Sequence, residues 1–357
     1  MKTFLAIILT GLHFGLAQGI VAVFQPELTE QDYRSTETFY QKIHSVAGQV
    51  ERQTGEEALF IFPEYIGAWL VAAGEKEAVF RARDLNAAMI RIILSHPFRF
   101  VWEFVATFVR DHFHGSLMGH VERAIFKMKA RTALRSYWEA FSRLAREHRA
   151  WVVAGSVLLP EVNRQTSPPS LCCRHPRTLY NQSFLFDPSG ALVSITKKAF
   201  PVSAELDFLN RGRLRDLPVA DTPFGRVGTM ICADSWHPEC YRHLDSLGVD
   251  ILAVPSLVNQ AERWIEPWGG YDPPQFDPGD VDPADLTGQV AEREMWKKYA
   301  LTRRMQSTGA EWGFNSFLIG HFWGLTGGGQ ANIIHRGTLE RELEDYRGSG
   351  VLVTRLP

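Results

Sequence analysis

The chain has 357 residues, of which 45% are hydrophobic and 22% charged, and its formal net charge at pH 7 is −2. This length and composition predict a globular protein with a sizeable core. The near-neutral charge argues against a nucleic-acid binder, and the sequence contains no glycine-rich phosphate loop or fixed-period repeat. The segment Cys172-Cys173-Arg174-His175 lacks a second ligand pair at zinc-site spacing, so no metal site is predicted.

The first residues combine one positive charge with an apolar run. Lys2 precedes apolar residues 3–16, and Gly15 and Ala17 place small residues at −3 and −1 of a cleavage point. This layout predicts that residues 1–18 are a secretory signal peptide or, merged with the apolar run that follows, an uncleaved anchor. We therefore expect an exported or membrane-tethered protein, periplasmic or extracellular. A cytosolic protein with an extended first strand is the alternative.

Strand and helix patterns alternate along the rest of the chain. Strands are expected at residues 20–25, 58–62, 151–154, 181–186, 191–196, 225–231, 250–255, 316–320 and 332–334. Helices are expected at residues 36–54, from Pro238 onward and at 291–307. This alternation predicts a layered α/β sandwich, and because no linker interrupts it, residues 19–357 are expected to form a single domain.

Residues 75–149 depart from this rhythm. They carry 14 Lys and Arg against 8 Asp and Glu, and they include a helical pattern at 97–109. In that pattern Phe98, Trp102, Val105 and Val109 fall on one face. A basic, aromatic amphipathic helix can lie on a membrane, so residues 95–130 are a candidate for peripheral membrane contact. A helix that packs on the core or covers an active site is the alternative.

Residues 259–291 have the opposite character. They contain seven acidic residues against one arginine, together with five prolines and four glycines. Such a segment cannot build its own core and predicts a long surface loop. The loop would cover a site, pair by charge with residues 75–149, or be a solvated excursion without a role.

Three side chains with reactive chemistry follow predicted strands. Glu64, Lys198 and Cys232 each stand just beyond the end of one strand. In open α/β sheets, functional residues collect at the carboxyl ends of the strands. A carboxylate, an ammonium and a thiol that meet there supply a base, an oxyanion stabiliser and a nucleophile.

The sequence around these side chains resembles the nitrilase superfamily, the carbon–nitrogen hydrolases with a Glu-Lys-Cys triad. The segments that carry the resemblance are FIFPEY, which ends at Tyr65, the hairpin from Tyr180 to Lys198, and ICADSWHPE, which ends at Glu239. The resemblance covers roughly residues 20–70 and 150–337, so that residues 75–149 and 259–291 are expected to be insertions. It implies the four-layer α-β-β-α sandwich of this family.

The resemblance also implies a role for each residue. Glu64 would be the general base and Cys232 the nucleophile. Lys198 and the backbone N–H of Ala233 would stabilise the oxyanion. Lys197 and Lys198 point to opposite faces of an extended strand, so only one can enter the site.

Family members place the lysine shortly before a proline or leucine and a second glutamate. The spacing from Lys198 to Pro201 and Glu205 favours Lys198 and makes Glu205 the candidate second carboxylate. Tyr65 and Trp236 are the candidate substrate-binding residues.

The implied reaction is hydrolysis of a small-molecule amide to an acid and ammonia or an amine, through a thioester on Cys232. It requires no metal or organic cofactor. True nitrilases usually carry Trp directly after the nucleophile, whereas Ala233 stands there in this chain, which favours amides. Acyl transfer from Cys232 to an amine, nitrile hydrolysis and a non-catalytic binding protein on the same scaffold are the alternatives. Relatives usually pair, so a homodimer or a larger homo-oligomer is expected.

Overall fold

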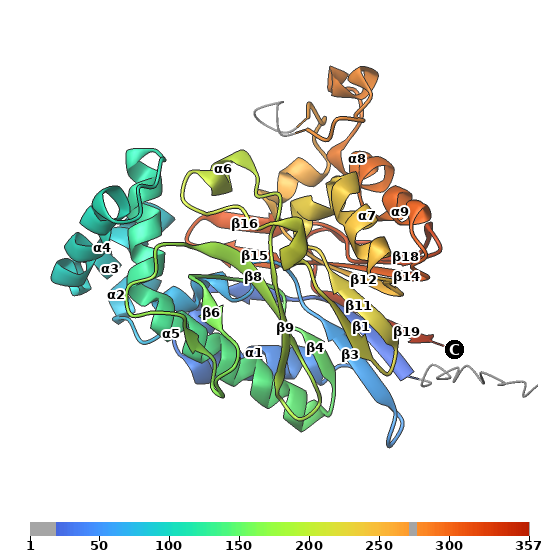
Figure 1. The fold of residues 1–357 in the computed structure, drawn as a ribbon, viewed down its shortest axis with the longest axis horizontal. Coiled ribbons are helices and arrows are strands. Elements are labelled where there is room, and N and C mark those ends of the chain that lie inside the picture. The colour runs from blue at the N-terminus through green and yellow to red at the C-terminus, as the bar shows by residue number, and fades with distance from the viewer. Residues whose placement is uncertain (1–18, 271–276, 357) are drawn as a thin grey trace, which may run out of the picture.

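The computed structural model describes residues 19–270 and 277–356 and contains two β-sheets that face each other, with helices on their outer sides (Figure 1). The predicted signal peptide or anchor at residues 1–18 lies outside the described residues. The layered α/β architecture expected from the sequence is confirmed.

The first sheet brings together strands from both ends of the described residues. Its strand order is β19 (Gly350–Leu356), β1 (Gly19–Gln25), β3 (Glu57–Ile61), β4 (Trp151–Val153), β8 (Tyr180–Phe186) and β5 (Val157–Leu159), with β9 (Leu192–Lys197) also paired to β8. The strands β1, β3 and β4 are parallel, and β19 runs antiparallel to β1.

The second sheet has a parallel centre formed by β11, β12 and β14. Its order is β10 (Val219–Thr222), β11 (Gly225–Thr229), β12 (Ile251–Ser256), β14 (Trp312–Phe317), β17 (Asn332–His335) and β18 (Thr338–Glu342). Smaller pairings join β13 (Val258–Asn259), β16 (Leu325–Gly328), β15 (Ile319–Phe322) and β2 (Glu27–Thr29), and join β6 (Val162–Asn163) to β7 (Ser170–Leu171).

The two sheets bury their facing sides against each other. Alternate residues of β1 and β3, such as Val21 and Leu59, pack with Val227, Ile251 and Phe314 of the second sheet. Their neighbours along the same strands point to the other side, because side chains alternate along a strand. This alternation gives each sheet an inner and an outer apolar face.

Helices cover both outer faces and complete the four layers. The helices α1 (Thr36–Ala47) and α5 (Leu117–His148) pack on the first sheet, and α7 (Pro238–Ser246) and α9 (Leu301–Arg304) pack on the second. The other helices are α2 (Glu77–Phe80), α3 (Leu85–Ser95), α4 (Pro97–Val109), α6 (Ser203–Leu206) and α8 (Glu292–Tyr299).

Three predicted boundaries are wrong, each for a local reason. Helix α1 ends at Ala47 instead of residue 54, because Gly48 follows and Gly55 adopts φ +84° in the next turn. The helix predicted at 291–307 is interrupted at Ala300, whose φ of −107° and ψ of −147° are not helical. The strand predicted at 316–320 is the junction where β14 ends at Phe317 and β15 begins at Ile319.

Residues 75–149 form helices of two kinds. The long helix α5 belongs to the outer layer, since its Tyr137, Phe141 and Leu144 are fully buried against the first sheet. The helices α2, α3 and α4 lie at one edge of the molecule, far from the second sheet (Figure 1). Among the described residues no single helix is long and apolar enough to span a membrane, and α3 and α4 reach that length only as a pair bent by 109°.

Candidate active site

Glu64, Lys198 and Cys232 converge at the carboxyl ends of their strands. Glu64 follows β3, Lys198 follows β9, and Cys232 opens the 3-10 turn Cys232–Trp236 that follows β11. All three side chains are buried, with exposed fractions of 2% for Glu64 and Lys198 and 8% for Cys232. The structure therefore brings together the three residues that the sequence singled out.

The Lys198 ammonium lies between two carboxylates. Its Nζ is 2.7 Å from Glu64 Oε1 and 2.6 Å from Glu205 Oε2. Lys197 points the other way, and its Nζ binds the carboxylate of Glu161 at 2.6 and 2.7 Å. Of the two adjacent lysines, Lys198 is the one that reaches Glu64, as predicted.

Asn181 connects the two carboxylates that hold the lysine. Its Nδ2 donates to Glu64 Oε1 at 2.8 Å and to Glu205 Oε1 at 3.1 Å. The Tyr65 hydroxyl donates to the same Glu205 oxygen at 2.8 Å. No role was predicted for Asn181, although an amide inside a buried strand needs polar partners, and this need was the available signal.

The nucleophile turn carries backbone strain at the cysteine. Cys232 has φ +49°, in the left-handed region that non-glycine residues rarely adopt. Its Sγ lies 3.7 Å from the carbonyl oxygen of Leu257. Such a strained conformation persists only where surrounding contacts hold it. Hydrogen bonds to Asp234 are among these contacts.

Asp234 ties the nucleophile turn to the segment after the lysine. Its Oδ2 accepts from the N–H of Ile231 at 3.0 Å, and its Oδ1 accepts from the N–H groups of Ala199 at 2.9 Å and Phe200 at 2.7 Å. This function of Asp234 was not predicted. The available signal was an acidic residue three positions after Ile231, the residue that precedes the turn, where a carboxylate can cap it.

Burial and neighbouring charges shift the pKa values of Glu64, Lys198 and Cys232. Burial raises the pKa of Glu64 to about 7, although the adjacent Lys198 opposes the rise. Burial lowers the pKa of Lys198, but the carboxylates of Glu205 and Glu64 outweigh it and raise that pKa well above its usual value. Burial and the Glu64 charge raise the pKa of the Cys232 thiol. The resting site thus holds a neutral thiol, a charged lysine and a carboxyl group that titrates near neutral pH.

Ala233, the residue after the cysteine, borders a cavity of about 360 Å³. The other residues that line the cavity are Phe200, Pro201, Val202, Arg211, His237, Glu239, Asp277, Pro278 and Gly279. Residues 277–279 of the loop predicted at 259–291 therefore lie beside the nucleophile turn. This position agrees with the expectation that the loop covers a site.

The two predicted substrate-binding residues occupy different surroundings. Tyr65 is half-buried and holds Glu205 through its hydroxyl. Trp236 is 1% exposed, with its ring 5.6 Å from that of Trp268 and 5.3 Å from that of Trp296. Trp236 therefore supports the turn from within an aromatic cluster, and its contact with substrate stays a prediction.

Among the described residues, no group of three or more His, Cys, Asp or Glu side chains is placed to hold a metal ion. The cysteines Cys172 and Cys173 are free and exposed.

Comparison with known proteins identifies the family of this chain. Residues 20–270 match the family model described as carbon-nitrogen hydrolase. A deaminated glutathione amidase from Yersinia enterocolitica is 29% identical over 126 residues, which cover 33% of this chain and 40% of the relative. Nitrilase 3 from Arabidopsis thaliana is 32% identical over 79 residues, 22% of this chain and 23% of the relative. The chain thus matches less than half the length of these curated relatives.

The fold has solved counterparts. The crystal structure of an amidase from Nesterenkonia sp. superposes with a TM-score of 0.53 at 15% identity, covering 98% of this chain and 94% of that one. The four-layer sandwich expected from the sequence is thereby confirmed.

Proposed function

Because the chain belongs to the carbon–nitrogen hydrolase family, we propose that it hydrolyses a small-molecule amide with Cys232 as the nucleophile. The observation that supports this most directly is the 2.7 Å contact between Lys198 Nζ and Glu64 Oε1. The Cys232 thiol lies close enough to Glu64 for each group to shift the pKa of the other. A nucleophile, its base and a cation therefore occupy one buried site.

The first half of the reaction forms a thioester. Glu64 accepts the thiol proton as Cys232 Sγ attacks the amide carbonyl carbon. The Lys198 ammonium and the Ala233 N–H stabilise the resulting oxyanion. Glu64 then gives the proton to the leaving nitrogen, the C–N bond breaks, and ammonia or an amine departs.

The second half releases the acid. Glu64, again ionised, takes a proton from water, and the water oxygen attacks the thioester carbonyl carbon. The oxyanion forms in the same place, and the C–S bond breaks to give the acid. The proton held by Glu64 returns to the Cys232 sulfur, which restores the starting state.

Glu205 and Asn181 fix the positions of Lys198 and Glu64 relative to each other. Lys198 contacts both carboxylates, and Asn181 spaces them by donating to one oxygen of each. Paired carboxylates around one ammonium hold it charged, which an oxyanion stabiliser requires.

The residue after the nucleophile supports amides over nitriles. Ala233 stands where true nitrilases carry Trp, and its small side chain borders the cavity at the nucleophile turn. The relatives reported above carry the names of both an amidase and nitrilases. The test therefore compares matched amides and nitriles of the same acyl group.

The experiment measures ammonia release and follows Cys232 by intact mass spectrometry. Wild-type protein is expected to release ammonia from amides and to carry an added acyl mass that hydroxylamine removes. Cys232→Ala should lose both signals, whereas Cys173→Ala, which removes an exposed thiol, should retain both. Full turnover by Cys232→Ala would contradict the proposal. If an added amine is acylated faster than the acid is released, acyl transfer from Cys232 to an amine is the favoured reaction instead.

We further propose that the chain is exported and acts as a homodimer or a larger homo-oligomer. The apolar run at residues 3–16 supports export, and the family resemblance supports pairing. Export predicts a mature N-terminus near Gln18, and an intact Met1 on the protein in the cytosol would contradict it. Light scattering on the purified protein gives its oligomeric state.

A further inference from the structure

The edge of the molecule formed by α3, α4 and the start of α5 exposes an apolar surface. It comprises Leu94, Phe98, Val101, Trp102, Val109 and Leu117, whose exposed fractions lie between 58% and 91%. Large apolar side chains gathered at this exposure mark a site of interaction with a partner or a membrane. We call these six residues the apolar edge.

Helix α4 exposes apolar side chains and directs polar ones toward the protein. Glu103 and Thr107 of α4, and Arg110 just after it, face inward, while Phe98, Trp102 and Val109 face solvent. A helix that packs on a protein core has the opposite arrangement.

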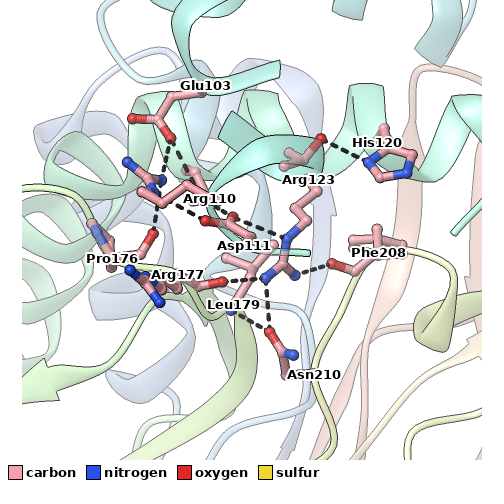
Figure 2. A network of polar contacts seen from close by, with 12 residues as sticks. Glu103, Arg110, Asp111, His120, Arg123, Pro176, Arg177, Leu179, Phe208 and Asn210 are labelled. Carbon is pink, nitrogen blue, oxygen red and sulfur yellow. Dashed lines mark hydrogen bonds and ion pairs between the residues drawn. The ribbon is translucent and has the colours of Figure 1, made fainter. Parts of the chain in front are cut away.

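A network of polar contacts explains why α4 stays in this orientation (Figure 2). Arg110 binds Glu103 at 3.4 Å and Asp111 at 3.0 Å, and Lys127 of α5 binds both of these carboxylates. The hydroxyl of Thr107 lies 2.7 Å from His120 Nδ1. Buried charges held by several partners are costly to break, so the apolar face of α4 stays outward.

The charge around the apolar edge is positive. Between residues 85 and 118 the acidic residues are Glu103 and Asp111, and both are paired inward. Arg99, beside Phe98, is exposed, and Arg91 on α3 is partly exposed. The carboxylate of Asp84, which caps the start of α3, is partly exposed but paired with Arg83 at 2.8 Å. Exposed arginines beside paired carboxylates leave this surface complementary to anionic lipid headgroups.

We propose that the apolar edge seats this protein on an anionic lipid membrane, lying in the interface without crossing it. The bend of 109° between α3 and α4 keeps both helices at the surface of the molecule. A second copy of the chain fits this surface less well, because a two-fold contact would bring equal positive charges such as Arg99 together. Trp102 and Phe98 have the side chains that favour the headgroup region.

The apolar edge is joined firmly to the candidate active site. Arg123 of α5 donates to the carbonyl oxygens of Phe208 at 2.8 Å and Arg177 at 2.6 Å (Figure 2). Asp207, just after the helix α6 that carries Glu205, accepts a 2.6 Å hydrogen bond from the N–H of Ser116. Docking through the apolar edge would therefore hold the site at a fixed height above the lipid, whatever reaction it catalyses.

Vesicle sedimentation of the full chain tests the proposal. We expect binding to vesicles that contain phosphatidylglycerol, and weaker binding to pure phosphatidylcholine or at high salt. The double variant Phe98→Ser/Val109→Ser should bind roughly 100-fold less, since burial of each such side chain is worth about a factor of ten. Ile265→Ser is the matched control, because Ile265 is apolar and exposed but lies outside the apolar edge. Equal binding by all three proteins would overturn the proposal.

Fluorescence quenching by brominated lipid separates the apolar edge from residues 1–18, which contain no tryptophan. Wild-type protein should be quenched on anionic brominated vesicles, and Trp102→Phe should lose most of that quenching. Identical quenching in both proteins would overturn the proposal. If the double variant instead changes the oligomeric state and leaves vesicle binding unchanged, the apolar edge is an interface between copies and the proposal is wrong.

Discussion

The carboxylate of Asp234 accepts a 2.7 Å hydrogen bond from the backbone N–H of Phe200, so the nucleophile turn and the lysine segment are held to each other directly. These segments follow different strands in different sheets. The relative placement of Cys232 and Lys198 therefore depends on this one side chain as well as on the packing of the sheets.

Replacing Asp234 should lower stability. Asp234→Ala leaves three N–H groups without their acceptor, two of them buried and one partly buried, and we expect a loss of about 3 kcal/mol in the free energy of unfolding. Urea unfolding followed by tryptophan fluorescence measures it. Asp245→Asn, at an exposed aspartate, should change stability by less than about 0.5 kcal/mol. Equal stability of Asp234→Ala and wild type would show that the sheets alone position the turn.

Substitution of the two adjacent lysines should separate their functions. Lys198→Met removes the cation beside Glu64 and should reduce kcat by about 100-fold to 1000-fold, the usual effect of losing an oxyanion donor. Lys197→Met removes the contacts with Glu161 and the Tyr180 ring, both outside the triad, and should leave kcat close to wild type. Steady-state kinetics on one amide gives both numbers. A greater loss in Lys197→Met would reverse the assignment.

Activity should increase with pH through the titration of Glu64. A general base works only when ionised, and the pKa of Glu64 is raised to about 7 by burial. We therefore expect kcat/KM to fall tenfold per unit as pH drops below about 7, and to level off above it. A profile from about pH 5 to about pH 9 tests this. Glu64→Gln should lack activity throughout, and an unchanged acid limb in that variant would exclude Glu64 as the base.

Removal of the Asn181 amide should move the acid limb of the kcat/KM profile to higher pH. The amide donates to the ionised form of Glu64, so its loss disfavours the carboxylate and raises its pKa further. Asn181→Leu should shift the limb upward by about one pH unit, the size expected for one hydrogen bond to a charged group. Ser183→Ala, on the same buried strand, is the control and should leave the limb in place. A fall in kcat without a shift in the profile would mean that Asn181 is merely structural.

The sequence predicted the parts of this protein that depend on local pattern. The strand before Glu64 is an apolar run, the strand before Lys198 mixes apolar and polar residues, and the apolar Met230 and Ile231 directly precede Cys232. The two adjacent lysines point to opposite faces, as strand geometry requires. These patterns placed the three side chains at strand ends and showed that only one lysine can enter the site. The family resemblance, through the spacing from Lys198 to Pro201 and Glu205, was needed to choose Lys198.

The parts that it missed depend on contacts between distant segments. Asn181 lies 117 positions from Glu64, and no spacing in the chain shows that one amide serves two carboxylates. The interruption at Ala300 is likewise absent from the apolar periodicity, which runs through it. The face of α4 was identified correctly, but its outward direction follows from the ion pairs of Arg110 and Lys127, which periodicity does not encode.

The pairing of β19 with β1 has a consequence for synthesis. The strand β1 is buried along its whole length and pairs with β19 from Gly19 and Leu356 to Gln25 and Gly350. A ribosome produces residues 19–25 early and residues 350–356 more than 300 residues later. Throughout that interval one edge of β1 has no partner, and an unpaired hydrophobic strand is a template for aggregation. We therefore expect chaperones that bind the nascent chain to reduce its aggregation until β19 is synthesised.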